Sequence, residues 1–172
     1  MSPSIPVIAA VVAIAMITEA WLSRMHERAL RAAGAVEPPG DVYAVMQVVY
    51  SGCFVFILAE AWWRGASGAL LVPGAIVFAI AKLLKWWAIT SLGTRWTFRV
   101  LVPVGAPLVE RGPYRWIRHP NYVAVVGELV GAAMMLGTPW SGTLASVVFG
   151  ALMWRRIQIE EKALGISQKS EV

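Results

Sequence analysis

Long apolar runs divide this sequence, and their length constrains the fold more than any other feature. A bilayer hydrocarbon core of about 30 Å needs roughly 20 consecutive apolar residues in a helix. The run from Ile5 to Leu22 meets that length, and its polar interruptions, Thr18 and Glu19, stand near its end. The same criterion predicts spans at about residues 5–22, 42–63, 69–89, 120–137 and 143–157. We therefore expect an all-α integral membrane protein, with five transmembrane helices in one domain over residues 1–172.

Composition agrees with the membrane class and argues against two others. Hydrophobic residues make up 58% of the chain and charged residues only 15%, too little charge to cover a soluble domain. The net charge of +5 does not indicate nucleic-acid binding, because the basic residues alternate with apolar runs instead of forming a stripe on a soluble face. The single cysteine, Cys53, lies in an apolar run, so we expect no disulfide framework and no metal site. The first run lacks a basic start and a cleavage site, which favours a retained span over a signal peptide.

The distribution of basic residues predicts the orientation in the membrane. Arginines and lysines concentrate in the predicted loop at 24–40, the segment 91–119 and the tail, whereas the opposite side carries Arg64 alone. Cytoplasmic loops of membrane proteins carry this excess of positive charge. The N-terminus is therefore expected outside and the C-terminus in the cytosol. The turn between 137 and 143 is so short that the last two spans are predicted to form a helical hairpin.

Ionisable residues inside the predicted spans each require a partner or a purpose. Glu60 and Arg64 stand four residues apart near the outer end of the second span and are expected to pair. Lys82 and Lys85 are expected to reach the membrane interface as anchors. Glu19, near the inner end of its span, is expected to reach water or to pair with Arg24.

Glu128 lies about two helical turns beyond Pro120, inside the fourth span. Gly127 and Gly131 flank it in a Gly-x-x-x-Gly pattern, which lets a neighbouring helix approach closely. The same absence of side chains would also leave room for a ligand that faces Glu128. Both interpretations are compatible with the sequence.

A dense group of polar residues precedes the fourth span, in "RGPYRWIRHPNY". Arg118, His119 and Tyr122 meet where a loop enters a helix whose first residue is Pro120. The hairpin brings the tail residues Arg156, Glu160 and Glu161 to the same side of the membrane. These groups either contact lipid phosphates, or they bind a zwitterionic ligand: carboxylates for an ammonium or ribose hydroxyls, and cations for a carboxylate.

The motifs "GPYRWIRHPNY" and "RRIQIEEKAL" resemble the isoprenylcysteine carboxyl methyltransferase (ICMT) family and its relatives, the phospholipid N-methyltransferases. The resemblance extends over about residues 92–164. It implies an integral-membrane enzyme that uses S-adenosylmethionine, releases S-adenosylhomocysteine, and has a cytosolic cofactor pocket beside the final hairpin. The segment 91–119 would then bind the cofactor, and residues 155–165 would form a cytosolic helix.

The resemblance also implies roles for individual residues. Arg156 matches the position that faces the methyl-accepting group, and Arg118 belongs to the motif, where it either binds the cofactor or braces the loop. Glu161 completes the acidic pair, and Glu161 or Glu128 could remove a proton from an acceptor that carries one. The cofactor contacts that the resemblance implies are Pro107, Leu108, Val109, Tyr114, His119, Pro120, Asn121, Tyr122 and Glu160.

The acceptor is expected to be a lipophilic small molecule. The short chain, rich in alanine, valine and arginine, looks bacterial or archaeal, where prenylated proteins are not expected. It looks like members that O-methylate alkylpyrones or alkylresorcinols, so the acceptor group would be a carboxylate, a phenol or an enol.

Two alternative functions remain compatible with the sequence. One is an NADPH-dependent sterol-type membrane reductase, which shares the Arg-His-Pro-Asn-Tyr motif but usually extends further past the paired acidic residues. The other is a small membrane protein without catalytic activity. The oligomeric state is not predicted.

Overall fold

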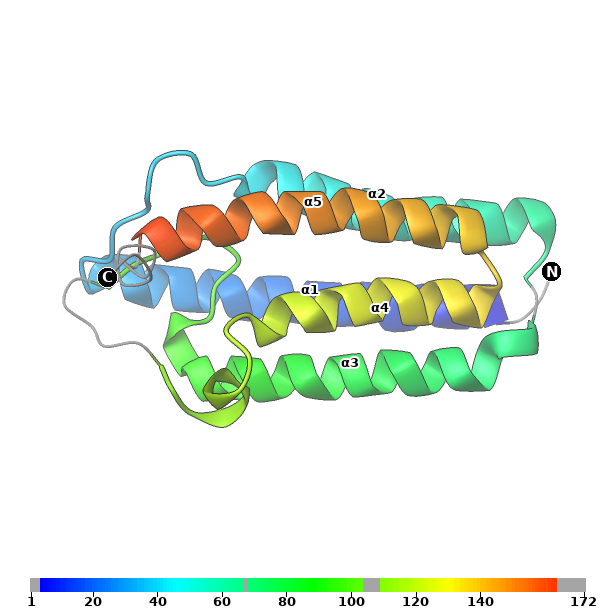
Figure 1. The fold of residues 1–172 in the computed structure, drawn as a ribbon, viewed down its shortest axis with the longest axis horizontal. Helices are drawn as coiled ribbons and strands as arrows, with labels where there is room; N and C mark the ends of the chain where they lie inside the picture. Colours follow the sequence, from blue (N-terminus) through cyan, green and yellow to red (C-terminus); the bar gives the residue numbers. More distant parts are fainter. Residues whose placement is uncertain (1–3, 67, 104–108, 164–172) are drawn as a thin grey trace.

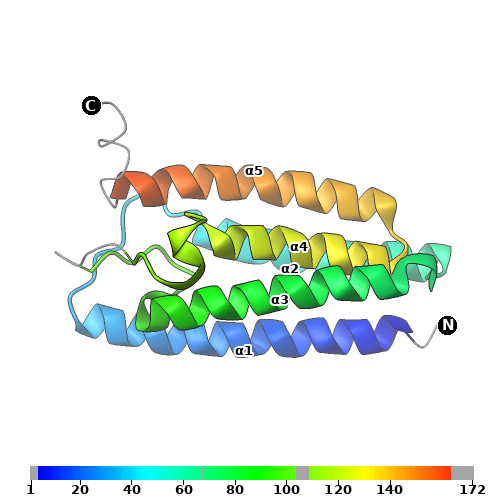
Figure 2. The same cartoon turned by 60° about the horizontal axis from the view of Figure 1, so that its bottom comes forward.

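Five long helices run along one axis of the molecule and alternate in direction (Figures 1 and 2). The computed structural model describes residues 4–66, 68–103 and 109–163. Within that part of the chain there is no strand, only an isolated antiparallel bridge between Val36 and Val102, and the all-α prediction is confirmed. The long helices are α1 (Ser4–Ala32), α2 (Tyr43–Arg64), α3 (Leu71–Leu92), α4 (Pro120–Leu136) and α5 (Pro139–Ala163). Single 3-10 turns are η1 (Gly68–Leu70), η2 (Gly93–Arg95) and η3 (Gly112–Arg115).

In the part of the chain that the structure describes, three segments are long and apolar enough to cross a bilayer: Ile5–Ala32, Tyr43–Arg64 and Gly68–Arg95. The helix α4 is also apolar but shorter. Apolar side chains cover the outside of the bundle; Val48 is 73% exposed and Leu83 is 71% exposed. An outer surface of this kind suits lipid and not water. The chain is therefore an integral membrane protein by helix length and surface chemistry.

Two predicted boundaries were wrong. Residues 24–32 were expected in a loop, but α1 continues through them to Ala32. The reason is amphipathic spacing: Ser23 and Leu30 are buried, while Arg24 and Arg28 face outward, so the helix keeps one packed face beyond the apolar run. The last helix starts at Pro139 instead of residue 143, because a proline fits the first helical turn without losing a hydrogen bond.

Glycines bring α3 and α4 into close contact. A Cβ atom on Gly131 would lie 2.7 Å from the backbone nitrogen of Phe78, and one on Gly127 would lie 2.8 Å from the Cβ of Ala81. Gly74 of α3 is equally close to α4 at Met135. The space beside these glycines is thus filled by the neighbouring helix, and the alternative that they leave room for a ligand is wrong.

We expect Gly131→Ala to destabilise the bundle by about 1–3 kcal/mol, because the added methyl meets the backbone of α3, which cannot move aside as a side chain can. Gly150→Ala is the matched control, since Gly150 also lies within a helix and has nothing within 4 Å of its virtual Cβ. Thermal unfolding in detergent, followed by tryptophan fluorescence, measures both. An equal effect of the two substitutions would contradict the close approach.

The connecting segments 33–42, 93–103 and 109–119 lie at the same end of the bundle as the end of α5 (Figure 1). The segment 96–102 is fastened there by side chains of α1 and of the first connection. Ser23 accepts a hydrogen bond from the backbone N–H of Phe98 at 2.8 Å, and Asp41 accepts one from that of Val100 at 3.0 Å. These hydrogen bonds hold the segment 96–102 in one position although it has no regular secondary structure.

Arg99 also holds the same segment in place, through an ion pair and a contact with an aromatic ring. Its guanidinium pairs with Glu37 at 2.7 Å and lies over the ring of Tyr43, 4.4 Å from the centroid. Burial opposes ionisation of Glu37, but hydrogen bonds from Arg31 and Arg99 outweigh it and lower the pKa of this carboxyl. The ion pairs therefore persist down to acidic pH.

Candidate functional site

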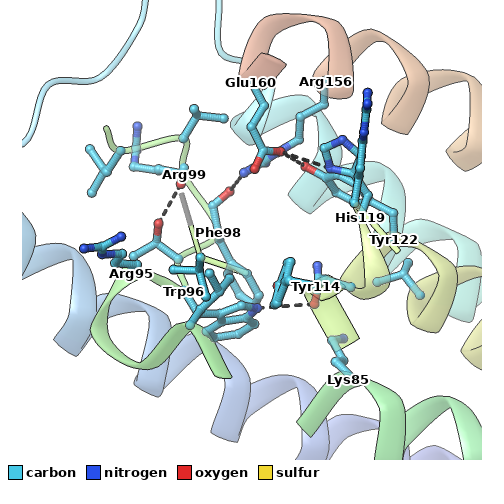
Figure 3. Close-up of a pocket in the computed structure, with 18 of the residues that line it drawn as sticks. Lys85, Arg95, Trp96, Phe98, Arg99, Tyr114, His119, Tyr122, Arg156 and Glu160 are labelled. Atoms are coloured by element: carbon cyan, nitrogen blue, oxygen red, sulfur yellow. Dashed lines mark hydrogen bonds and ion pairs between the residues drawn. The ribbon is translucent and has the colours of Figure 1, made fainter. Parts of the chain in front are cut away.

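A cavity of about 760 Å³ opens at this end of the bundle, between the segment 95–102 and the ends of four helices. Figure 3 shows Arg156 and Glu160 of α5 on one side, together with Tyr122 of α4 and His119, which precedes α4; Trp96 and Phe98 lie on another side, and Lys85 of α3 below. The volume is within the usual range for pockets that hold a small organic ligand. Residues from distant parts of the sequence therefore share one cavity.

The acidic side of the cavity joins α4 to α5. The Tyr122 hydroxyl donates a hydrogen bond to Glu160 Oε2 at 2.9 Å, and His119 Nε2 lies 3.2 Å from Glu161 Oε1. The rings of His119 and Tyr122 are 5.5 Å apart and tilted by 30°. His119 is the N-cap of α4 and Tyr122 lies in its first turn, because Pro120 opens the helix between them. Two carboxylates and two aromatic rings are thus presented together.

Arg156 lies one helical turn before Glu160 on α5 and provides a buried cation at the cavity. The residue is only 7% exposed. One terminal nitrogen donates to the carbonyl of Phe98, and the other lies 4.0 Å from Asp41 Oδ1. Among the described residues, its Nε has no hydrogen-bond partner. A buried donor without a partner is costly, and Arg156 bears this cost at the wall of the cavity.

Aromatic residues form a third wall. Trp96 donates from its indole Nε1 to Asn121 Oδ1 at 3.3 Å, and the rings of Trp96 and Phe98 meet edge to face at 5.3 Å. Burial and then the charge of Glu160 raise the pKa of Tyr114, which keeps its phenol protonated. Flat apolar surfaces with hydrogen-bonding edges suit a heteroaromatic ring.

Below the cavity lies a buried network of opposite charges. Glu19 of α1 accepts from Lys82 at 2.7 Å and from Lys85 at 2.6 Å, and Glu128 of α4 lies 3.1 and 3.2 Å from the same two lysines. Tyr50 of α2 donates its hydroxyl hydrogen to Glu128. Two ammonium groups therefore balance two carboxylates away from water, which is the condition for burying ions at tolerable cost.

This network corrects three expectations. Lys82 and Lys85 were expected to act as interface anchors, but Lys85 is 2% exposed and both lysines point to carboxylates. Glu19 was expected to reach water or an arginine, yet it is 1% exposed and pairs with the lysines. The physical reason is that paired opposite charges inside the bundle cost less than bending long side chains past lipid. The expected pair of Glu60 with Arg64 is confirmed at 3.5 Å.

Most residues singled out from the sequence border the cavity. Pro107 and Leu108 lie outside the described residues. Among those described, Pro120 and Glu128 are fully buried and absent from the cavity wall; Pro120 starts α4, and Glu128 stands behind Tyr50 and Lys85. The singled-out residues that line the cavity are Val109, Tyr114, Arg118, His119, Asn121, Tyr122, Arg156, Glu160 and Glu161.

Sequence reasoning missed several residues of the cavity wall, among them Tyr50, Trp96 and Phe98, and it did not place Lys85 there. The sequence did contain one indication of the buried charge network. Two acidic and two basic residues lie within apolar segments, and charged groups are seldom tolerated there unless they pair. No local pattern marks Tyr50 or the segment 96–102, whose positions depend on how distant segments meet.

Residues 74–166, more than half of the chain, match the model of the isoprenylcysteine carboxyl methyltransferase (ICMT) family. The chain belongs to this family. The match includes α4, α5, the segment 95–102 and the third helix with both lysines, hence most of the cavity wall. The resemblance of the two motifs is thereby confirmed.

Individual relatives agree with the family. This ICMT-family chain is 27% identical over 164 residues to the "Uncharacterized protein YpbQ" of Bacillus subtilis, covering 90% of this chain and 93% of that protein. It is 27% identical over 110 residues to "Protein-S-isoprenylcysteine O-methyltransferase A" of Arabidopsis thaliana, covering 60% of this chain and 51% of the plant protein. The yeast protein of that name, from Saccharomyces cerevisiae, is 36% identical over 61 residues, which cover 33% of this chain and 24% of that protein. No solved structure matches this chain.

Proposed function

We propose that this protein is an S-adenosylmethionine-dependent methyltransferase that methylates an oxygen atom of a lipophilic acceptor at the membrane. The observation that carries the proposal is the cavity beside α4 and α5, where Tyr122, His119, Glu160 and Arg156 meet in the part of the chain that matches the family. Relatives with matching sequence are named O-methyltransferases. The proposed acceptor is a long-chain carboxylate, phenol or enol, of the alkylpyrone or alkylresorcinol type.

The residues of the cavity fit such a cofactor. Glu160 and Glu161 suit an ammonium group or ribose hydroxyls, and the aromatic wall at Trp96 and Tyr114 suits a purine ring. Arg118 is 76% exposed and 4.0 Å from Glu161, so it is placed at the rim and suits a carboxylate there. Arg156 adds a cation to the wall of the same cavity.

When bound, the cofactor supplies a methyl group that is already activated by its sulfonium charge. The task of the protein is then to hold the acceptor in line and to exclude water. Arg156 is held by Phe98 and Asp41 and lines the cavity, so its positive charge can orient an acceptor oxygen. The segment 96–102 forms one wall of the cavity.

The proposed membrane arrangement has five spans, with the N-terminus outside and the cavity on the cytosolic side of a bacterial or archaeal membrane. It is supported by the excess of arginine at the end of the bundle where the cavity opens and by the apolar outer surface. The connection of α4 to α5 through Gly137 and Thr138 makes these two helices neighbours. An acceptor with a long apolar tail can reach such a cavity from the lipid.

Binding of S-adenosylhomocysteine, with NADPH as the comparison, tests the proposal. Calorimetric titration of the detergent-solubilised protein is expected to show affinity for S-adenosylhomocysteine and none for NADPH. Binding of NADPH alone would instead identify a reductase. Binding of neither nucleotide would favour a protein without catalytic activity.

Transfer of labelled methyl from S-adenosylmethionine into a lipid extract of the host is the companion measurement. Label is expected in a lipid with an O-methyl group. Label on the nitrogen of a phospholipid headgroup would contradict the proposed acceptor while leaving the cofactor assignment intact.

A further inference from the structure

Tyr50 lies where the cavity meets the buried network of charges. It lines the cavity, and its hydroxyl donates to Glu128, which is fully buried and not part of the cavity wall. Lys85 also belongs to both. An ammonium group can only donate hydrogen bonds, whereas a hydroxyl that has donated its hydrogen keeps two lone pairs. Tyr50 is therefore the network member that can accept a proton from a ligand.

The network holds Glu128 against Tyr50. Lys82 and Lys85 contact Glu128 Oε1 at 3.1 and 3.2 Å, and the Tyr50 hydroxyl donates to Glu128 Oε2. The Tyr50 hydrogen is thus committed to Glu128, and its oxygen faces other groups as an acceptor only. The titratable groups around Tyr50 are Glu19 from α1, Cys53 from α2, Lys82 and Lys85 from α3, and Glu128 from α4; α5 contributes the uncharged Phe149.

The surroundings of Tyr50 suit an acceptor with an apolar body. Met46 stands one turn before it on α2, Phe149 packs against its ring with centroids 5.1 Å apart, and Val125 lines the same part of the cavity. Apolar walls exclude water, so a hydroxyl group delivered there has Tyr50 as a hydrogen-bond acceptor.

We infer that Tyr50 is a catalytic residue that receives the proton of the acceptor's hydroxyl group, with Glu128 behind it as the final proton acceptor. This inference rests on the proposed function and narrows it. It selects an acceptor that carries a hydroxyl, a phenol or an enol, over a carboxylate, which has no proton to give.

The step balances without any further reagent. The acceptor O–H bond breaks and its proton bonds to the Tyr50 oxygen, while the original Tyr50 proton passes to Glu128 Oε2. The freed electron pair of the acceptor oxygen bonds to the methyl carbon as the carbon–sulfur bond breaks, and that bond's electrons stay on sulfur. One positive charge leaves the sulfonium and one appears in the network. The proton returns to water through Tyr50 after the product leaves.

Binding measurements with two lipids test the acceptor role without any turnover. Pentadecylresorcinol carries hydroxyl groups, and pentadecylbenzene has the same tail without them. With S-adenosylhomocysteine present, the wild type is expected to bind the resorcinol about 10-fold more tightly, because a hydrogen bond to a polarised hydroxyl contributes about this factor. Tyr50→Phe, which keeps the ring, is expected to abolish the difference. Tyr43→Phe is the matched control on the same helix, outside the cavity, and is expected to keep it.

The pH dependence of methyl transfer separates proton acceptance from mere positioning. Tyr50→Phe is expected to lower the rate with pentadecylresorcinol by roughly 100-fold or more at neutral pH, the usual contribution of a general base. Its rate should then rise about tenfold per pH unit up to the phenol pKa of about 10, because the small ionised fraction of the phenol increases tenfold per unit over that range. The wild type is expected to show no such steep rise. A uniform loss at every pH would overturn the proton relay.

Other outcomes overturn the inference and leave the proposed function standing. These are equal affinity of the wild type for the two lipids, or a methylated host lipid that releases its label as methanol in mild alkali, as a carboxylate ester does. Both measurements need no variant, so they decide even if Tyr50→Phe does not fold. Failure of the wild type to bind S-adenosylhomocysteine would instead remove the proposed function, and the inference with it.

Discussion

Replacing Lys85 with methionine is expected to lower the free energy of unfolding by about 3–5 kcal/mol, the usual cost of removing one partner from a buried ion pair. The methionine side chain fills similar space but leaves Glu19 and Glu128 facing Lys82 as their shared cation. One negative charge then stays uncompensated inside the bundle, where water cannot solvate it. Unfolding in mixed micelles, followed by tryptophan fluorescence, measures the change.

Two further variants show whether charge is the cause of that loss. Lys162→Met removes an exposed lysine near the end of α5 and is expected to change stability by less than about 0.5 kcal/mol. The double variant Lys85→Met with Glu19→Gln restores neutrality and is expected to recover part of the loss. If Lys85→Met were as harmless as Lys162→Met, the buried network would not contribute as described.

Replacing Glu160 with alanine is expected to weaken binding of S-adenosylhomocysteine roughly 10- to 100-fold, the range for losing a hydrogen bond to a charged group. Glu160 lines the cavity at about 31% side-chain exposure and holds Tyr122, so its loss removes a carboxylate and releases an aromatic ring. His119→Ala is expected to act in the same direction. Calorimetric titration of the solubilised protein gives the affinity.

Gln158→Ala is the control for that experiment, because Gln158 lies two residues away on α5 with an exposed side chain. All three variants are expected to keep the thermal midpoint of the wild type within a few degrees. Unchanged affinity in both the Glu160 and His119 variants would show that the cofactor does not bind at this side of the cavity.

The two kinds of polar residue in this chain differ in how far the sequence could predict them. His119, Tyr122 and Glu160 stand in local motifs at helix ends, where a resemblance transfers residue by residue, and the structure gathers them at one cavity. Glu19, Lys82, Lys85 and Glu128 were recognised as costly, but their pairing with one another was not predicted. Each was judged against its own helix, whereas its partners come from α1, α3 and α4.

Gly131 gives the same lesson for packing. The Gly-x-x-x-Gly pattern allowed either a close helix or a bound ligand, because both need the absence of a side chain. Only the position of Phe78 on α3 decided for the helix.

The sequence alone determined that the chain is helical and resides in a membrane, because apolar runs of bilayer length leave the backbone no other way to satisfy its hydrogen bonds. It also determined the family, through motifs in which neighbouring residues act together. The tertiary structure decided which charges neutralise one another and that Tyr50 connects Glu128 to the cavity. Such pairings depend on the rotation and register of packed helices, which distant residues set and no local pattern records.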